Sequence, residues 1–440
     1  MELFIAFGVF IAAMLVAVIG GFSMIPPLLI GLAAFLAVGK RRGYSCRSMA
    51  LMSQKSLLDS LVVIKVMLII GALTAVWRAA GTITVFVYYG MKVILPPIFL
   101  LVTFVLCCLL SYAIGTSFGI AGTVGVIFMA LARSGGVDPV IAAGVVMSGI
   151  YFGDRCSPVS SSANLVAGVT GTEIYGNVKM MFRTALLPLA AVTAVYAALS
   201  FANPVSHVDQ EMISAFENEF VLSFWAFVPA VLMIALPFFK VGVVKAMAAS
   251  IASGLLVACF VQGLSPAEAL KICVFGYQAE GEGLAAILNG GGLVSMLEIV
   301  GILIISSTYS GIFNGTSMLL SLQDRLSSAC RKSGRFAVTL CMSIGVSAVF
   351  CNQTIATMMC CDLMKQPYLS GGGNREELAI DLENSVILIA CYVPWSIGCS
   401  VPMSLLGADV SSLPFAVYMY AVPLFYLLTK RRWFKDKEKS

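Results

Sequence analysis

The sequence has few charged residues, one histidine and no paired-cysteine motif, and each shortage excludes a class of protein. Charged residues make up 11% of the 440 positions, against about 25% in an ordinary soluble domain. With one histidine and no Cys-x-x-Cys pair, the ligand patterns of a structural zinc or haem site are missing. No Gly-x-x-x-x-Gly-Lys-[Ser/Thr] string occurs, which argues against ATP-driven transport. We expect no cofactor and no enzymatic activity, because no nucleophile–base set stands out.

Hydrophobic residues, in contrast, make up 60% of the chain. They form repeated runs close to the roughly 20 residues that a membrane-spanning helix needs. The runs are continuous rather than alternating, unlike the strands of a transmembrane β-barrel. We therefore predict an all-α polytopic membrane protein. Most of the 13 cysteines lie inside apolar runs, where cysteine acts as a small hydrophobe.

The charged residues indicate the orientation of the chain. Basic blocks at 40–47, 325–335 and 430–439 flank apolar runs, as cytoplasmic loops do. The net charge of +5 is therefore not a sign of nucleic-acid binding. The linker 203–219 has acidic residues but no lysine or arginine, which places it outside. We expect an inner-membrane protein with both termini in the cytoplasm.

The two halves of the chain follow one order of segments, which predicts a repeat. Each half has two crossings, a mixed segment, a third crossing, an apolar run broken by a polar tip, a run broken at a proline, and a last crossing. In the first half the mixed segment, 45–59, is expected to lie along the membrane surface. If each polar-tipped run is a re-entrant hairpin, each half crosses the membrane five times. Because five is odd, the two halves are inverted relative to each other. Inverted repeats with broken helices are typical of secondary transporters. The predicted units are 1–202, the external linker 203–219, 220–430, and the basic cytoplasmic tail 431–440.

Two strings of residues resemble a known family. They are Gly153-Asp154-Arg155, Ser157-Pro158, Ser160 and Asn164-Leu165 in the first half, and Leu382-Glu383, Ser385 and Pro394-Trp395 in the second. Both are similar to motifs of the NhaC family of Na⁺/H⁺ antiporters. The resemblance implies a homodimer whose protomers have a scaffold and a transport domain that moves as an elevator. It also implies hairpin tips at 115–119 and 351–354, and unwound helices at 154–158 and 392–396.

The sequence departs from the family pattern at two positions. Ser161 and Asn384 stand where the family commonly has aspartate. A proton-coupled exchanger needs a group that exchanges Na⁺ for H⁺, so the loss of two carboxylates leaves the coupling open.

Oxygen-bearing side chains near the tips and breaks are the candidate Na⁺ ligands, because unwound helices add free carbonyls and helix-end partial charges. The first-half candidates are Asp154, Ser157, Ser160, Asn164, Thr116 and Ser117. Their second-half counterparts are Asn352, Gln353, Thr354, Glu383, Ser385 and Ser396.

Asp154 is the principal candidate, as metal ligand for Na⁺ and as proton carrier. A carboxylate at the bilayer centre costs about 2.5–3.5 kcal/mol on insertion scales, so such a residue points to function. The alternative is a structural ion pair with Arg155, or a position at the interface. Arg155 itself has three interpretations: it neutralises Asp154, binds an organic anion, or extends to the interface. Glu383 is either a functional group or a polar loop end.

The sequence thus predicts a secondary-active, cation-coupled antiporter, with Na⁺/H⁺ exchange by alternating access as the main hypothesis. The alternative on the same fold is Na⁺-coupled transport of a small organic acid or amino acid. A channel or receptor fits paired broken helices less well. The expected partners are these ions or a small-molecule substrate, membrane lipid and a second copy of the chain.

Overall fold

The computed structural model describes residues 2–93, 96–205, 210–239, 241–279, 282–316 and 323–434. Parts of the predicted linker (206–209) and tail (435–440) lie outside these residues. Within them the chain is helical without a β-strand, and one antiparallel bridge joins Tyr277 and Gly290. Six helical stretches in this part are long and apolar enough to cross a bilayer: Glu2–Gly20, Ser60–Ala79, Ser117–Ser134, Ile174–Ala202, Val243–Phe260 and Val294–Thr316. The protein is therefore an all-helical, polytopic membrane protein, as its composition predicts.

The chain begins with α1 (Glu2–Gly20) and α2 (Ile25–Arg41), which pack together. The next helix, α3 (Cys46–Ala79), is continuous over 34 residues, or about 51 Å at 1.5 Å per residue. The prediction of a separate surface segment at 45–59 is therefore wrong. No glycine or proline interrupts the stretch 46–70, so nothing ends the helix before the crossing. Ser45 caps its start by accepting a hydrogen bond from the Ser48 amide at 3.1 Å.

The other helices of the first half are α4 (Thr82–Val93), α5 (Phe99–Ile114), α6 (Ser117–Ile120), a π-helical turn (Ala121–Gly125), α7 (Val126–Ser134), α8 (Pro139–Cys156), α9 (Ser161–Thr170) and α10 (Ile174–Ala202). Short 3₁₀ turns occur at Pro96–Ile98, Phe224–Phe227, Val294–Met296 and Val410–Phe415.

The second half contains α11 (Gln210–Glu219), α12 (Val228–Phe238), α13 (Val243–Phe260), α14 (Pro266–Phe275), α15 (Glu282–Leu288), α16 (Leu297–Thr316), α17 (Gln323–Ser333), α18 (Arg335–Phe350), α19 (Gln353–Ser370), α20 (Arg375–Glu383), α21 (Val386–Ile389), α22 (Ile397–Leu406) and α23 (Val417–Trp433). Helix α11 falls inside the predicted linker 203–219. Its Phe216 is fully buried and Tyr88 donates a hydrogen bond to Glu217 at 2.7 Å, so this stretch packs on the protein.

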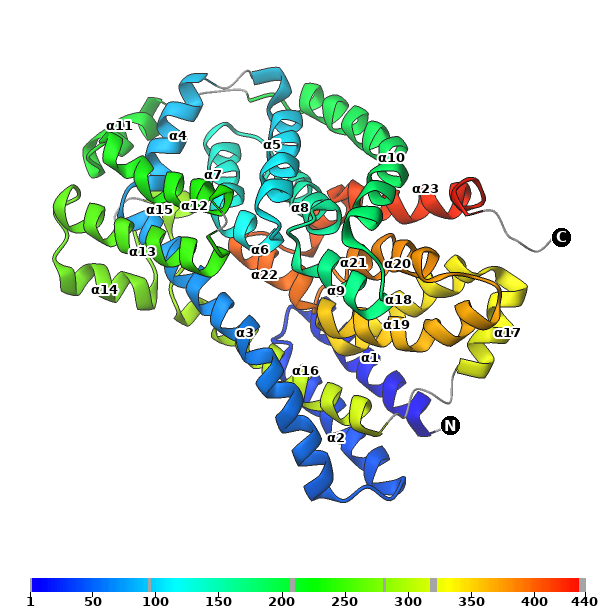
Figure 1. Ribbon diagram of the computed structural model, residues 1–440. Coiled ribbons are helices and arrows are strands. Elements are labelled where there is room, and N and C mark those ends of the chain that lie inside the picture. The colour runs from blue at the N-terminus through cyan, green and yellow to red at the C-terminus, as the bar shows by residue number, and fades with distance from the viewer. Residues whose placement is uncertain are drawn as a thin grey trace.

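Long helices surround a centre of interrupted ones. Helix α3 packs along α16 and α13, while α5 packs along α8 and α18 along α19. Figure 1 shows α3 and α16 running side by side toward α2, with α6, α8, α9, α21 and α22 gathered near the middle. In that view α11 and α14 lie on one side of the molecule, and α17 and α23 on the other. The interrupted helices at the centre carry most of the predicted site residues.

Candidate functional site

The first predicted tip joins α5 to α6 and contacts the break between α8 and α9. Helix α5 ends at Gly115, whose φ is +73°. Thr116 then caps α6 by accepting a hydrogen bond from the Gly119 amide at 3.3 Å. A Cβ atom on Gly115 would lie 2.7 Å from the carbonyl carbon of Val159. Glycine is therefore required here, because the tip combines a positive φ with a close backbone approach.

The second tip, between α18 and α19, has the same local form. Cys351 ends α18 with a φ of +54° and is the one non-glycine residue with positive φ in the described part of the chain. Asn352 caps α19, since its Oδ1 accepts hydrogen bonds from the amides of Thr354 at 2.9 Å and Ile355 at 3.4 Å. The Cys351 carbonyl accepts a hydrogen bond from the Ile397 amide at 2.8 Å. This tip thus contacts the start of α22, just after the second break.

A side chain from each break also holds the helix that precedes its tip. Ser157 Oγ donates to the Tyr112 carbonyl at 2.6 Å. Trp395 Nε1 donates to the Ala348 carbonyl at 2.7 Å. Tyr112 and Ala348 occupy the same place relative to the positive-φ residue of their tip. Each break therefore contacts the same position relative to its tip.

The first break spans 157–160, slightly later than the predicted 154–158, so Asp154 is still helical. Ser160 caps α9 by accepting hydrogen bonds from the next amides, at 3.2 Å from Ser162. Asn164 Nδ2 donates to the carbonyls of Pro158 at 2.8 Å and Ser160 at 2.7 Å. Because helix ends leave backbone groups without partners, these side chains, together with Ser157, stabilise the break itself.

The second break is longer than predicted. Residues 384–385 interrupt the helix first, between α20 and α21, and 390–396 form the non-helical stretch before α22. The predicted stretch 392–396 lies in this second part. Ser385 Oγ donates to the Asp381 carbonyl at 2.6 Å and accepts from Ser343 at 3.0 Å. Ser396 caps α22 by position, yet its buried hydroxyl has no hydrogen-bond partner among the described residues.

Asp154 lies in the last turn of α8 and is 3% exposed. Its Oδ2 accepts a hydrogen bond from Gln353 Nε2 at 3.1 Å, and its Oδ1 accepts from Ser160 Oγ at 3.3 Å. Gln353 Nε2 also donates to the Ile387 carbonyl at 2.8 Å. The carboxylate makes no ion pair within the described part of the chain. Because a carboxylate can accept about four hydrogen bonds, Asp154 keeps capacity for a further cationic partner.

A cavity of about 380 Å³ opens beside this carboxylate and lies between the two hairpin tips. The predicted residues that line it are Asp154, Thr116, Ser117, Asn352, Gln353 and Thr354. Ser161 and Ser162 also line it, and helices α3 and α13 supply an apolar wall that includes Met67 and Met247. The predicted residues outside its lining are Ser157, Ser160, Asn164, Glu383, Ser385 and Ser396. Oxygen-bearing residues from both tips and one buried carboxylate residue therefore line one cavity.

Arg155, the next residue, is fully buried and faces a different set of partners. Its Nη1 donates to Cys156 Sγ and to the Tyr418 hydroxyl, each at 3.2 Å. Its Nη2 donates to the Met181 carbonyl at 3.2 Å, to Thr184 Oγ1 at 2.9 Å, and to Asn384 Oδ1. Arg155 is absent from the cavity lining. The guanidinium thus joins the end of α8 to α10, to α23 and to the interruption after α20, instead of pairing with Asp154.

Glu383 is also fully buried, and neither carboxylate oxygen has a hydrogen-bond partner among the described residues. Its charge interacts with the opposite charge of Arg155 and the like charge of Asp154. A buried carboxylate is costly unless a charge or hydrogen bonds compensate it. Arg155 is a cation near Glu383, although the two form no ion pair within 4.0 Å.

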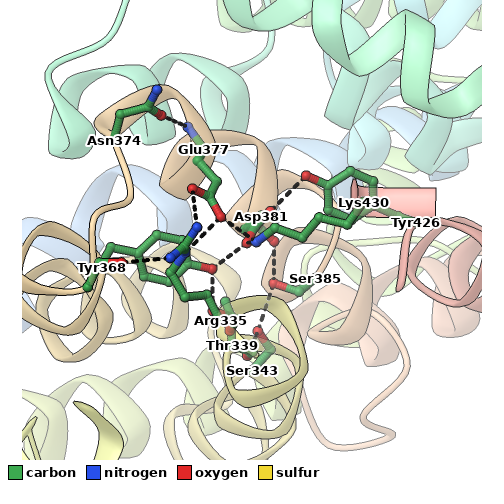
Figure 2. A network of polar contacts seen from close by, with 11 residues as sticks. Arg335, Thr339, Ser343, Tyr368, Asn374, Glu377, Asp381, Ser385, Tyr426 and Lys430 are labelled. Atoms are coloured by element: carbon green, nitrogen blue, oxygen red, sulfur yellow. Dashed lines mark hydrogen bonds and ion pairs between the residues drawn. The ribbon is translucent and has the colours of Figure 1, made fainter. Parts of the chain in front are cut away.

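A second acidic centre, shown in Figure 2, lies on the same helix as Glu383. The Glu377 carboxylate receives two hydrogen bonds from Arg335, at 2.9 and 3.1 Å, and pairs with Lys430 at 2.7 Å. Asp381 accepts from Tyr426 at 2.8 Å, and also from Tyr368 and Lys430. This network ties α20 to α18, α19 and α23. Its carboxylates are occupied by protein donors, which makes the network structural.

Neither this network nor the apolar wall of the cavity is predicted from the sequence. Glu377 and Asp381 are four residues apart, which puts both on one face of a helix, and that spacing was the available signal. From the sequence, Lys430 is simply part of a basic block. The partners of Asp381 and the cavity wall come from distant segments, which periodicity does not reveal.

Comparisons with known proteins agree with the motifs. The model of the Na⁺/H⁺ antiporter family matches residues 149–429, which include the first break, the second tip and the second break. The Na⁺/H⁺ antiporter NhaC of Alkalihalophilus pseudofirmus is 28% identical over 371 residues, covering 82% of this chain and 80% of that protein. The malate-2H⁺/Na⁺-lactate antiporter of Bacillus subtilis is 27% identical over 429 residues, covering 94% and 90%.

The arginine/ornithine antiporter ArcD of Halobacterium salinarum is 26% identical over 436 residues, covering 94% of this chain and 88% of that protein. The family model matches well over half of the chain, and these three relatives are each similar over most of their length. The chain therefore belongs to the Na⁺/H⁺ antiporter family.

Proposed function

We propose that this protein is a secondary-active antiporter that exchanges Na⁺ for H⁺ by alternating access. The observation that carries the proposal is Asp154, a buried carboxylate that opens on the cavity between two hairpin tips and makes no ion pair among the described residues. Family membership and the NhaC relatives support the same activity.

One carboxylate serves both cargoes in this proposal. Na⁺ binds oxygen atoms, and the oxygen-bearing residues Thr116, Ser117, Asn352 and Thr354 line the cavity beside Asp154. When Na⁺ leaves, a proton takes its place on Asp154, because an uncompensated charge at membrane depth is costly. The Na⁺-bound and the protonated forms of Asp154 therefore exclude each other, and exchange of the two ions requires this.

The mechanism we propose is an elevator in an inverted repeat. It is supported by the two locally equivalent tips, each with a positive-φ residue, a cap and a bond to a break. The hairpins and broken helices would form the moving domain, and α3, α13 and α16 part of the scaffold of a homodimer. The basic ends of α2, α17 and α23 support cytoplasmic placement for both termini in an inner membrane.

A second candidate is Na⁺-coupled transport of a small organic acid or amino acid. The cavity volume, about 380 Å³, favours it, because one water occupies only about 30 Å³ in the liquid and small-molecule sites begin near 300 Å³. The malate–lactate and arginine–ornithine relatives agree with this possibility. Arg155, however, does not line the cavity, so a substrate carboxylate has no guanidinium partner there.

Reconstitution in proteoliposomes tests the main proposal. An outward Na⁺ gradient should drive proton uptake by the wild-type protein, and Asp154→Asn should abolish it. Asp362→Asn, which removes an exposed carboxylate on α19, should leave exchange intact. Undiminished exchange by a folded Asp154→Asn protein would contradict the proposal. Labelled malate or arginine uptake that requires Na⁺, without Na⁺-driven proton movement, would favour the second candidate.

A further inference from the structure

A second cavity, of about 840 Å³, lies between the start of α18 and the ends of α17 and α23. Its basic lining residues are Arg331, Lys332, Arg335, Lys430 and Arg431. Glu377 is the one acidic residue among the described residues that line it. The cavity is therefore strongly positive, and it is separate from the residues around Asp154.

Three of these cations have no neutralising partner in the described part of the chain. Glu377 pairs with Arg335 and Lys430. Its single negative charge is therefore already shared by these two cations. Arg331, Lys332 and Arg431 are exposed and form no ion pair with a described residue. They come from two helices that are distant in sequence but converge at the cavity. A ligand with negative charge would complete this arrangement.

The start of α18 adds donors of the same kind. Its N-cap residue, Gly334, has no side chain to cap the helix, and Gly334, Phe336 and Ala337 line the cavity. The first amides of a helix point outward without intrahelical partners and favour anions. Basic side chains and free amides together are the usual recognition elements for a phosphate group.

An apolar strip on α23 leads away from the basic cavity. Leu424, Leu427 and Leu428 are 52%, 41% and 83% exposed. With Arg431 they follow the spacing i, i+3, i+4 and i+7, which places all four on one face of the helix. Leu427 lines the cavity itself. A ligand on this face meets positive charge at one end and exposed hydrocarbon along its length.

We propose that this cavity binds the headgroup phosphate of an anionic phospholipid, with an acyl chain along the leucine strip of α23. Free phosphate would use the cations and the amides but would gain nothing from the leucines. In a membrane protein, basic pockets beside spanning helices are suited to anionic lipids. The site is distinct from the transport cavity, so the proposal does not depend on the exchanged ions.

Lipid retention by the purified protein tests the proposal. Native mass spectrometry would count phosphatidylglycerol and phosphatidylcholine molecules bound after delipidation and titration with each lipid. We expect the wild type to bind phosphatidylglycerol in preference to phosphatidylcholine. Arg331→Gln/Lys332→Gln/Arg431→Gln should weaken phosphatidylglycerol binding about tenfold or more, since each basic residue near the surface contributes to the attraction. Leu427→Ser/Leu428→Ser should weaken it as well.

A matched control removes equal charge elsewhere. Arg42→Gln/Arg47→Gln/Lys55→Gln changes three exposed cations that do not line the cavity, and it should leave phosphatidylglycerol binding unchanged. The proposal is overturned if this control loses as much binding as the cavity variant, or if the cavity variant binds normally. It is also overturned if glycerol phosphate, which lacks acyl chains, competes as well as the intact lipid. If the triple variant does not fold, Arg431→Gln alone takes its place in the binding measurement.

Discussion

At the scale of single residues, the two buried carboxylates of the centre have different surroundings. Asp154 faces the cavity and receives hydrogen bonds from the neutral side chains of Gln353 and Ser160. Glu383 lies outside the cavity lining, without a hydrogen-bond partner among the described residues but close to the charge of Arg155. Asp154 is thus available to a cargo ion from the cavity, whereas Glu383 lies away from the cavity, on the side of Arg155.

Arg155→Gln should destabilise the protein by about 3–5 kcal/mol, because it leaves the Glu383 carboxylate buried without its counter-charge. The double variant Arg155→Gln/Glu383→Gln should recover a substantial part of that loss. Thermal unfolding of the four proteins in one detergent gives the coupling between the two sites. If the two substitutions simply add, Arg155 does not compensate Glu383.

The sequence predicts which polar residues lie beside the cavity better than it predicts what their side chains contact. Asp154 and the tip residues Thr116, Ser117, Asn352, Gln353 and Thr354 were singled out because polar groups interrupt apolar runs, and these residues line one cavity. Ser157 and Asn164 were predicted as ligands, yet their side chains bond to nearby carbonyls. Local sequence does not show whether a hydroxyl or amide meets an ion or a backbone group.

At the scale of elements, each hairpin tip is fixed to a broken helix through its backbone. Gly115 lies against the Val159 carbonyl carbon, and Cys351 accepts a hydrogen bond from Ile397. The places of the tips and the second break could be predicted, because glycine, proline and polar residues interrupt apolar helices there. The continuity of α3 could not be predicted from its mixed polarity, because polarity changes along a helix without ending it.

Gly115→Ala should lower both stability and transport rate. An alanine would have to adopt φ near +73°, which costs about 1–2 kcal/mol, and its Cβ would clash with the Val159 backbone at 2.7 Å. Thermal unfolding and Na⁺-driven proton flux are the measurements.

Gly345→Ala is the matched control for this prediction. Gly345 lies inside α18, and a Cβ atom there meets nothing within 4 Å. This substitution should be neutral or stabilising by up to about 1 kcal/mol, because alanine favours helix. Equal unfolding temperatures for Gly115→Ala and the wild type would refute the proposed role of the tip glycine.

At the scale of the whole molecule, helices that are distant in sequence close the cavity and the network of Figure 2. Gln353 reaches Asp154 across the two halves, and Lys430 from the last helix reaches Glu377 and Asp381 on α20. The all-helical membrane fold and the interrupted helices at its centre could be predicted from the apolar runs and their interruptions. These long-range pairings could not be, because a single sequence gives spacing along the chain but not which segments meet.

The proposed orientation predicts the accessibility of one thiol. Cys46 is exposed, free and next to Arg47 at the start of α3. A membrane-impermeant maleimide should label it in everted membrane vesicles but not in intact cells, because the basic end is placed in the cytoplasm. Cys46→Ser should remove that label, whereas Cys341→Ser, which removes the other exposed thiol of the described residues, should leave it in place. Labelling of Cys46 in intact cells would reverse the orientation.

The proposed exchange depends on one carboxylate that binds either Na⁺ or H⁺. The most direct measurement is the dissociation constant of Na⁺ for the purified protein, determined by titration calorimetry across a range of pH. If protons compete for Asp154, this constant should rise as the pH falls, approaching tenfold per pH unit, and Asp154→Asn should abolish the binding. A Na⁺ dissociation constant that is independent of pH, or that survives in Asp154→Asn, would contradict the account.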